Sequence, residues 1–470
     1  METIADRLFH EKRPTQRGVH IWIGLDFGTA TTECVVQIEP PTPTPTPDSI
    51  AVLAFKGSSR NDAQVVFPSA MEIFDGVVLP SYKLKRKGKI IEMFKSDLVA
   101  EIRENNPAGP SLHRTDGHFC RSVRHLASVL ALARRAIAGW LPSQEFDFHL
   151  NIGAPIGADS DNRDDAKIRE VFHELAYRAL ELSAEWPEQP PTIQKSVELS
   201  NRSMQIKVPS VNDSRVTVVP EALAAVTSFL KSPSRVAAAF ATIDVGGAST
   251  DISYFWYSTG EFDALSEPKA WYYSVRSERV GTNNLIHGLN SSVDPGFRGP
   301  AHERLSNCSS LEAEIQPEYI LKFKDALEES YRNAFRDAYS LDGNLSSWVN
   351  QAQPRVAKWT LLLLGGGCGF RVVKDFLQLT PPSNSNAEEH GEVEMLRPPK
   401  ELGVLLPVGI YLPLHIADGN DILTQCGHLV TVAHGLAFRS PDIPKYGMHD
   451  LVVLPPRQPD SEQPAHGNDG

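Results

Sequence analysis

The sequence DFGTATTE at residues 26–33 returns at residues 244–251 as DVGGASTD, with aspartate, glycine, alanine, threonine and an acidic residue at the same offsets. Each copy lies between two stretches rich in β-forming residues, which are 19–25 and 34–38 for the first copy and 237–243 and 252–257 for the second. Glycine between two such stretches indicates a tight turn between strands. One such turn is a weak signal, but two matching copies predict a repeated strand–turn–strand unit.

The residues of these turns suit a phosphate group. Glycine lets the backbone approach a ligand closely, and successive turn N–H groups form a concavity that binds anions. Hydroxyl donors are supplied by Thr29, Thr31, Ser249 and Thr250. Asp26 and Asp244 end the preceding strands and would repel phosphates unless a divalent cation intervened. Two facing turns would therefore clamp a phosphate chain, with Mg²⁺ held through water by these two carboxylates.

Four further segments of the sequence have patterns that predict a structure or a binding role. Residues 365–369 read GGGCG after four leucines and before a predicted helix, which places close-approach backbone at a helix N-terminus, although alone this could be a plain strand-to-helix turn. Apolar helices are predicted at 220–230 and 429–438. Alternating lysines over 81–89 predict an edge strand with one solvated face, and a polyphosphate or nucleic-acid patch is the alternative.

The totals narrow the class of protein. With 470 residues and 41% hydrophobic content, the chain can form two or three compact units. Its 46 basic and 58 acidic residues give a net charge of −12, which does not favour a nucleic-acid or anionic-membrane partner. The 5 cysteines form no CxxC pair, so a disulfide framework or zinc ribbon is not indicated. Without a secretion signal or an apolar spanning segment, the expected location is the cytoplasm.

The order of these motifs resembles the phosphate 1, connect 1, phosphate 2, adenosine and connect 2 motifs of the Hsp70 and actin ATPase superfamily. The resemblance runs from about Val19 to Arg439. It implies the α/β actin-like ATPase fold, in which two related domains with mixed β-sheets flanked by helices surround a nucleotide cleft. The implied divisions are an N-terminal tail (1–18), domain I (19–219, with a Pro-Thr loop at 40–47), domain II (220–427, with a connecting helix at 220–231), a second connecting helix (428–440) and a disordered tail (441–470).

The resemblance also assigns roles. It implies that Glu221 orients or deprotonates the attacking water, that Lys95 contacts the transferred phosphate, and that Asp26 and Asp244 hold Mg²⁺ through water. The implied nucleotide-binding residues are Gly28, Thr29, Ala30, Gly246, Gly247, Ala248, Ser249, Gly281, Gly365, Gly366, Gly367 and Phe370. By composition alone, Glu221 would be an ordinary acid at a helix N-terminus and Lys95 a surface lysine.

Some positions depart from the pattern. Gly369 stands where Hsp70 chains carry an arginine that stacks on adenine, so Arg371 is the substitute candidate, and Asn283 and Asn284 replace common acidic residues. About thirty residues follow Arg439, too few for the peptide-binding domain of an Hsp70 chaperone.

We therefore expect an enzyme that binds ATP and Mg²⁺, hydrolyses ATP slowly to ADP and phosphate, and presents its open and closed states to an unidentified protein partner. Two alternatives stay open. The first is a small-molecule kinase of the same fold, with a base among Asp159, Asp161, Asp164 and Asp165. The second is a non-catalytic or filament-forming scaffold.

Overall fold

The computed structural model describes most of the chain that carries the repeated motifs. The described residues are 19–39, 50–56, 63–85, 87–92, 94–104, 114, 117–142, 145–156, 163–210, 215–230, 238–258, 269–278, 280–286, 312–340, 360–379, 393–395, 403–405, 411–413, 430–439, 443 and 445–448. The predicted N-terminal tail and the Pro-Thr loop lie outside them, as do Asp159 and Asp161 of the kinase alternative.

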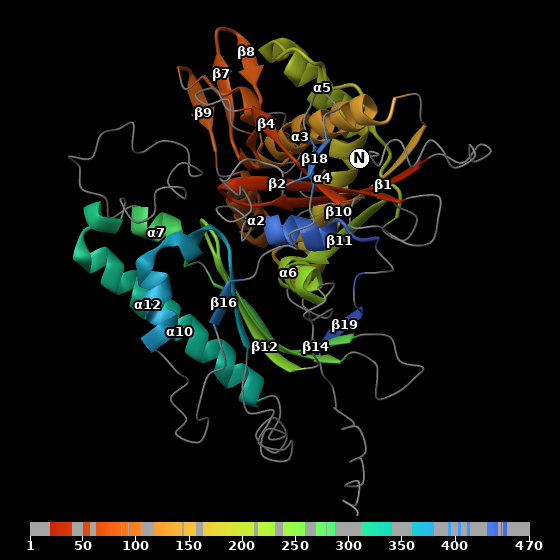
Figure 1. Cartoon of the computed structure of the whole chain (residues 1–470). Coiled ribbons are helices and arrows are strands. Elements are labelled where there is room, and N and C mark those ends of the chain that lie inside the picture. The colour runs from red at the N-terminus through yellow and green to blue at the C-terminus, as the bar shows by residue number, and fades with distance from the viewer. Residues whose placement is uncertain are drawn as a thin grey trace, which may run out of the picture.

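Two large mixed sheets flanked by helices form the α/β fold (Figure 1). The first sheet has the order β11-β10-β1-β2-β3-β17-β18, and β6 also pairs with β2. Its strands are β1 (Val19–Phe27), β2 (Thr31–Glu39), β3 (Ile50–Leu53), β6 (Val66–Pro68), β10 (Phe146–Ala154), β11 (Val216–Pro220), β17 (Gly403–Leu405) and β18 (Tyr411–Pro413).

The second sheet has the order β16-β15-β12-β13-β14-β19. Its strands are β12 (Ala238–Val245), β13 (Thr250–Ser258), β14 (Lys269–Glu278), β15 (Thr360–Leu364), β16 (Val393–Met395) and β19 (Lys445–Met448). Two smaller sheets pair β4 with β5 and place β7 between β8 and β9. These short strands are β4 (Phe55–Lys56), β5 (Ala63–Gln64), β7 (Met71–Phe74), β8 (Val77–Leu79) and β9 (Lys89–Ile91).

The two large sheets repeat one pairing pattern. In the first, β1 is antiparallel to β2 and parallel to β10, β2 is antiparallel to β3, and β10 is parallel to β11. In the second, β12, β13, β14, β15 and β16 take the same places with the same directions. Because a parallel neighbour requires a crossover and an antiparallel one only a turn, each half begins with a hairpin and returns through a helical connection.

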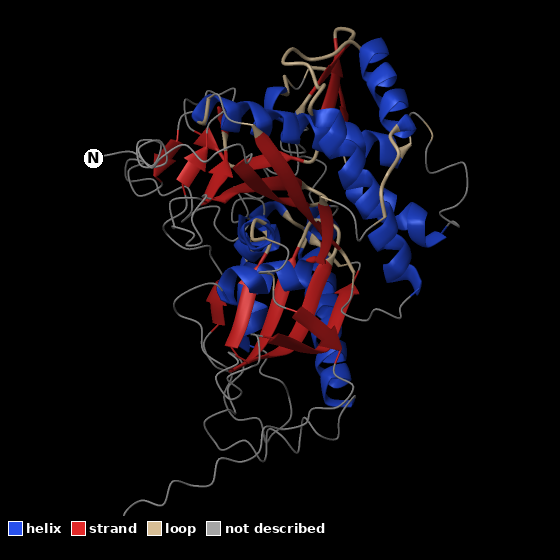
Figure 2. Cartoon of the chain, turned by 90° about the vertical axis from the view of Figure 1, so that its right-hand side faces the viewer, coloured by secondary structure: helices blue, strands red, loops and turns tan. Residues whose placement is uncertain are grey.

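Helices pack beside both sheets (Figure 2). They are α2 (Phe94–Glu104), α3 (His118–Trp140), α4 (Arg163–Ser183), α5 (Ile193–Gln205), α6 (Glu221–Leu230), α7 (Thr282–Ile286), α10 (Pro317–Ser340) and α12 (Arg371–Leu379), with short 3-10 helices η2 (Ser81–Lys83) and η5 (Gly366–Gly369). A further helix covers 430–436. None of the described helices is long and apolar enough to cross a membrane.

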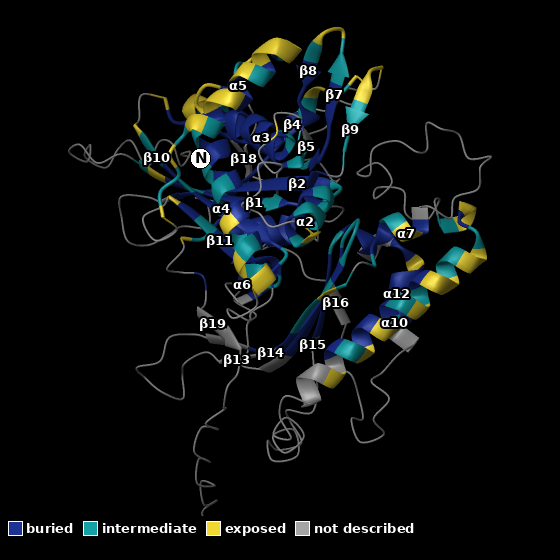
Figure 3. Ribbon diagram, turned by 180° about the vertical axis from the view of Figure 1, so that it is seen from behind, coloured by how far each residue is buried: buried dark blue, intermediate teal, exposed yellow. Residues whose placement is uncertain are grey.

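The burial pattern explains why these segments are helical. Helix α3 is buried along most of its length, whereas α10 has one buried and one exposed face (Figure 3). The buried face of α10 carries Phe323, Leu327, Tyr331 and Ala334, which recur at helical spacing and pack in the core of the second sheet. Leu321 lies on the opposite face and is exposed.

The helix over 430–436 crosses α6 at very close range. A β-carbon at Gly435 would lie 1.7 Å from the carbonyl oxygen of Ala224, so the crossing requires glycine. Beside it, the Ser228 hydroxyl and His434 Nδ1 are hydrogen-bonded at 2.7 Å. Gly435 is therefore a point of very close approach between the two helices.

Three sequence predictions differ from the structure. Strands β17 and β18 belong to the first sheet, although 220–427 was predicted as domain II, because β17 pairs in parallel with β3. Residues 445–448, predicted within a disordered tail, form β19 beside β14. The segment 81–89 does not form one edge strand: Lys89 begins the edge strand β9, whereas the described residues before it lie in η2 and in a loop. The buried Glu72 carboxylate holds this loop by accepting hydrogen bonds from the backbone N–H groups of Lys87 and Gly88 (2.7 and 2.6 Å).

Candidate functional site

The two hairpins carry carboxylates at matching places. Asp26 near the end of β1 lies directly opposite Glu33 on β2, and Asp244 near the end of β12 lies directly opposite Asp251 on β13. Like charges at such cross-strand positions repel each other. Each copy of the repeat therefore brings a pair of acids to the turn end of its hairpin.

The two turns also close in the same way. A β-carbon at Gly28 would lie 2.5 Å from the Thr31 carbonyl oxygen, and one at Gly246 would lie 3.0 Å from the Ser249 carbonyl oxygen. In the second turn, the Gly246 N–H donates a hydrogen bond to that oxygen at 2.8 Å. Since the chain returns so closely on itself, both positions favour glycine.

The turns face each other across the two sheets. A β-carbon at Gly247 would lie 3.3 Å from the β-carbon of Ala30. The third glycine segment reaches the same place, because a β-carbon at Gly365, whose φ is +80°, would lie 2.1 Å from Asp244 Oδ1. Segments more than 200 residues apart in the sequence thus meet around one point.

The first turn is held from behind by buried hydroxyl groups. Ser69 donates from its hydroxyl to the Gly28 carbonyl at 2.7 Å and from its N–H to the Ala30 carbonyl at 2.9 Å. The Thr32 hydroxyl lies 2.8 Å from the Ser69 hydroxyl and 2.9 Å from His125 Nε2. Burial lowers the pKa of His125 to about 3, so this ring is neutral at physiological pH.

The second turn is held by the segment that departs from the Hsp70 pattern. The N–H of Thr282 donates to the Gly246 carbonyl at 3.0 Å, and the N–H of Asn283 donates to the Gly247 carbonyl at 2.8 Å. Asn284 Oδ1 accepts from the Gly281 N–H at 3.1 Å. This segment therefore supports the turn from behind.

A pocket of about 70 Å³, called the turn pocket below, lies where the three glycine segments meet α2, α6 and the helix over 430–436. Most of the predicted site residues line it. These are Asp26, Gly28, Thr29, Ala30, Lys95, Glu221, Asp244, Gly246, Gly247, Ser249, Gly365 and Gly366. The residues that the repeat and the motif order singled out therefore lie together around one pocket.

Other predicted residues do not line the turn pocket. Phe370, predicted to bind nucleotide, is fully buried in the core of the second sheet, where its side chain packs. A β-carbon at Gly367 would lie 2.2 Å from Val245 Cγ1, so this glycine serves close packing too. Ala248 and Gly281 lie in the backbone contact behind the second turn. Arg371, the substitute candidate for adenine contacts, is exposed and pairs with Asp375 at 3.2 Å.

Thr31, which was expected to supply a hydroxyl donor, also lines the turn pocket. The pocket contains three further residues that were not assigned to the site, which are Glu33, Asp251 and Val432. The sequence did mark Glu33 and Asp251, because each is the acidic residue at the end of its copy of the repeat. No local pattern marked Val432.

Lys95 and Glu221 form a buried ion pair. Lys95 near the start of α2 donates a hydrogen bond from Nζ to Oε1 of Glu221, the first residue of α6. Burial alone would lower the pKa of Lys95, but Glu221 and Asp26 more than offset it, so the pKa is raised and the ammonium stays charged. Lys95 is the single cation among the residues that line the turn pocket.

The carboxylates outnumber that cation. Burial, followed by the charge of Glu221, raises the pKa of Asp26 to about 7 and that of Asp251 to about 6. Burial also raises the pKa values of Glu33 and Asp244 well above their ordinary range, with the charges of Asp26 and Asp251 as the next causes. Perturbed acids gathered in a cleft are typical of a functional site.

No family model matches this chain, and no curated protein matches it.

The acids of the turn pocket fit a hard divalent cation. Carboxylate oxygens are the ligands that Mg²⁺ prefers, and its charge would offset the repulsion between Asp26, Asp244 and their neighbours. Glu33 adds an independent sign, because its Oε1 is buried without a hydrogen-bond partner while the side chain lines the pocket. Buried carboxylate oxygens usually have a partner.

A second cavity, called the side cavity below, adjoins the turn pocket and has a volume of about 290 Å³. The two share Glu221 and Asp251 in their linings. The side cavity is also lined by Arg103, Asp165 and Arg276. Asp165, from the predicted acidic cluster, therefore lies near the turn pocket, whereas Asp164 pairs with Lys167 at 3.2 Å on α4.

Proposed function

We propose that this chain binds ATP with Mg²⁺ between its two glycine turns and hydrolyses it slowly. The observation that carries the proposal is the meeting of two copies of one turn, each with its own carboxylate pair, around a single pocket. The repeated pairing pattern of the two sheets and the crossing of the two helices at Gly435 add support for the actin-like, two-domain arrangement.

In this proposal, backbone N–H groups of the turns at Gly28 and Gly246 bind phosphate oxygens. Asp26 and Asp244 hold Mg²⁺ through water, and the ion offsets the negative charge of the phosphates. Glu221 orients the attacking water and accepts its proton, while Lys95 keeps that carboxylate in position and faces the transferred phosphate. Positioning and charge neutralisation are the main demands of phosphoryl transfer, so a small set of residues suffices.

The size of the turn pocket implies movement. At about 70 Å³ it is smaller than the roughly 300 Å³ or more that ligand sites usually have, so the turns must separate to admit a nucleotide. Opening and closing of two sheets about the crossing of their helices is the motion that a protein partner would sense. The sparse cysteines fit a reducing compartment, and we propose the cytoplasm as the location.

The test is ATP hydrolysis by the Glu221→Gln variant. We expect ATP binding to persist and the rate of hydrolysis to fall about 100-fold or more, because the general base is lost. Glu198→Gln is the matched control, since Glu198 pairs with Lys195 at 3.3 Å on the exposed surface of α5. An unchanged rate in Glu221→Gln would remove this residue from the mechanism, whereas ATP binding without hydrolysis by the wild type would favour a non-catalytic scaffold.

A small-molecule kinase is the second candidate, and the side cavity is the observation that favours it. An acceptor held there by Arg103 or Arg276 would lie beside Glu221, with Asp165 as the base. ATP consumption that rises only when a sugar, polyol or hydroxy acid is added, and that is lost in Asp165→Asn, would favour the kinase. Equal consumption with and without such acceptors would exclude it.

A further inference from the structure

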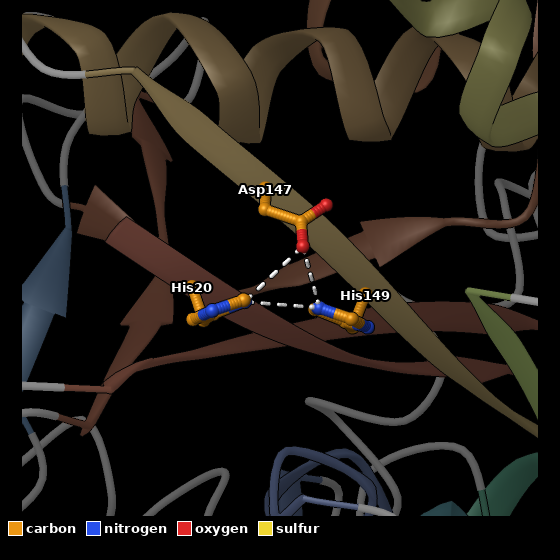
Figure 4. Close-up of side chains that lie close together, drawn as sticks. All are labelled: His20, Asp147 and His149. Atoms are coloured by element: carbon orange, nitrogen blue, oxygen red, sulfur yellow. Dashed lines mark hydrogen bonds and ion pairs between the residues drawn. The ribbon is translucent and has the colours of Figure 1, made fainter. Parts of the chain in front are cut away.

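Three side chains converge on the first sheet, away from the turn pocket (Figure 4). His20 on β1 lies directly opposite Asp147 on the parallel strand β10, and His149 follows two residues later, opposite Trp22. Because side chains alternate along a strand, Asp147 and His149 point to the same face. His20 lies six residues before Asp26, about 20 Å along an extended strand, so the cluster is separate from the turn pocket.

The three ligand atoms form a small triangle. Asp147 Oδ2 lies 3.2 Å from His20 Nδ1 and 3.1 Å from His149 Nε2, and the two nitrogens are 3.3 Å apart. In a tetrahedral zinc site with bonds of about 2.0–2.1 Å, neighbouring ligand atoms are about 3.3–3.4 Å apart. The triangle therefore has nearly the size of one face of a zinc tetrahedron before any adjustment.

We propose that His20, Asp147 and His149 bind one Zn²⁺ ion, with water in the fourth position. Imidazole nitrogens with one carboxylate oxygen suit zinc or a similar first-row ion, whereas Mg²⁺ prefers oxygen ligands alone. Water can reach the site, because the side chains of His20 and Asp147 are 46% and 40% exposed. Three protein ligands and one open position are typical of zinc that binds an exchangeable ligand rather than of a closed structural site.

Neighbouring residues and the paired strands hold the proposed ligands in position. The ring of Trp22 stacks on His149 with centroids 4.3 Å apart and planes 17° from parallel, which fixes the direction of Nε2. All three residues stand on two directly paired strands, so the backbone sets their spacing.

The three side chains can also pair with one another without metal, because both imidazoles can donate a hydrogen bond to Asp147 Oδ2. Binding Zn²⁺ would replace these hydrogen bonds with bonds to the metal, since a neutral imidazole that coordinates through one nitrogen carries its proton on the other. The two states differ in bound metal, which makes them distinguishable by measurement.

The experiment compares Zn²⁺ binding by the full chain and its variants after removal of metal with a chelator. We expect the wild type to bind one more Zn²⁺ per chain than the His20→Asn/His149→Asn double variant. The single variant His20→Asn, at an exposed position, should weaken this binding about 100-fold or more, since even indirect partners of metal ligands change affinity about 10–100-fold. Bound Co²⁺ should show visible absorption that both variants lose.

His118→Asn is the matched control. His118 pairs with Asp97 at 3.4 Å and is comparably exposed, but no third metal ligand completes that pair within the described chain. It should bind Zn²⁺ as the wild type does. Circular dichroism of the metal-free variants checks their folding. Equal stoichiometry and affinity in wild type and His20→Asn would overturn the proposal and leave the triangle as a hydrogen-bonded group alone.

Discussion

The acids of the turn pocket stand at positions that cost stability in the metal-free chain. Asp26 faces Glu33, and Asp244 faces Asp251, across adjacent strands, with Lys95 as the single cation in the lining. A fold selected for stability alone would not keep two such pairs. The arrangement is explained when a cation and a phosphate chain supply the missing interactions, since binding sites often trade stability for function.

This cost predicts an unusual dependence of stability on pH. The pKa of Asp26 is about 7 in the folded chain, above its ordinary value of 3.8, so the folded state binds the proton more tightly than the unfolded state. The free energy of unfolding should therefore rise as pH falls from about 8 to about 6 with a chelator present, and the effect of Asp251, whose pKa is about 6, should follow at the lower end. Urea denaturation at several pH values measures it.

The variant Asp26→Asn tests the same residue directly. It should stabilise the metal-free chain at about pH 8 by roughly 1–2 kcal/mol, because it removes one buried repulsive charge, and it should flatten the pH dependence. Asp75→Asn is the control, because Asp75 is an exposed turn residue with φ of +50°, a conformation that asparagine also accepts. The opposite result would be a free energy of unfolding that decreases in the wild type as the pH falls from about 8 to about 6, and it would contradict this explanation of the acids.

At the scale of elements, the site depends on two hairpins that come from distant parts of the chain. Each turn is held by its own neighbours, Ser69 for the first and the Thr282 segment for the second. Neither hairpin forms a pocket alone. The contact between Ala30 and Gly247 is the point where the two become one site.

A double cysteine variant tests that contact. The β-carbons of Ala30→Cys and Gly247→Cys would start 3.3 Å apart, close to the roughly 3.5–4.5 Å of a disulfide. Mild oxidation should close a large loop that moves faster on a non-reducing gel, and Mg²⁺ with ATP added first should slow closure by separating the turns. Each single variant is a control, and the native Cys34 and Cys120 are buried. Failure to form the crosslink without nucleotide would refute the turn–turn contact.

Sequence reasoning found these elements because their signals are local. The two hairpins and α6 were predicted nearly at their observed bounds, since strand composition, a glycine turn and the repeat all act over fewer than twenty residues. Strands β17, β18 and β19 were misassigned because only long-range pairing with β3 and β14 defines them. The cluster of His20, Asp147 and His149 was missed for the same reason, since nothing local joins β1 to β10.

At the scale of the whole molecule, two sheets of the same pairing pattern are joined at a helix crossing that leaves no room for a side chain at Gly435. Asn151 adds to this junction by donating from Nδ2 to the carbonyl oxygens of Leu436 and Phe438, both at 2.7 Å. The junction ties the helix over 430–436 to the first sheet, while α6 leads from β11 of that sheet toward β12 of the second. In the proposed function, movement about this crossing opens and closes the turn pocket.

Binding of ATP with Mg²⁺ at the turn pocket can be measured by calorimetric titration of ATP into the full chain. We expect one binding site per chain that requires Mg²⁺ and that weakens at least about tenfold in the Asp26→Asn/Asp244→Asn variant, whose metal-free fold should be as stable as the wild type or more so. Absence of saturable binding by the wild type, or equal binding by the variant, would contradict the proposed function.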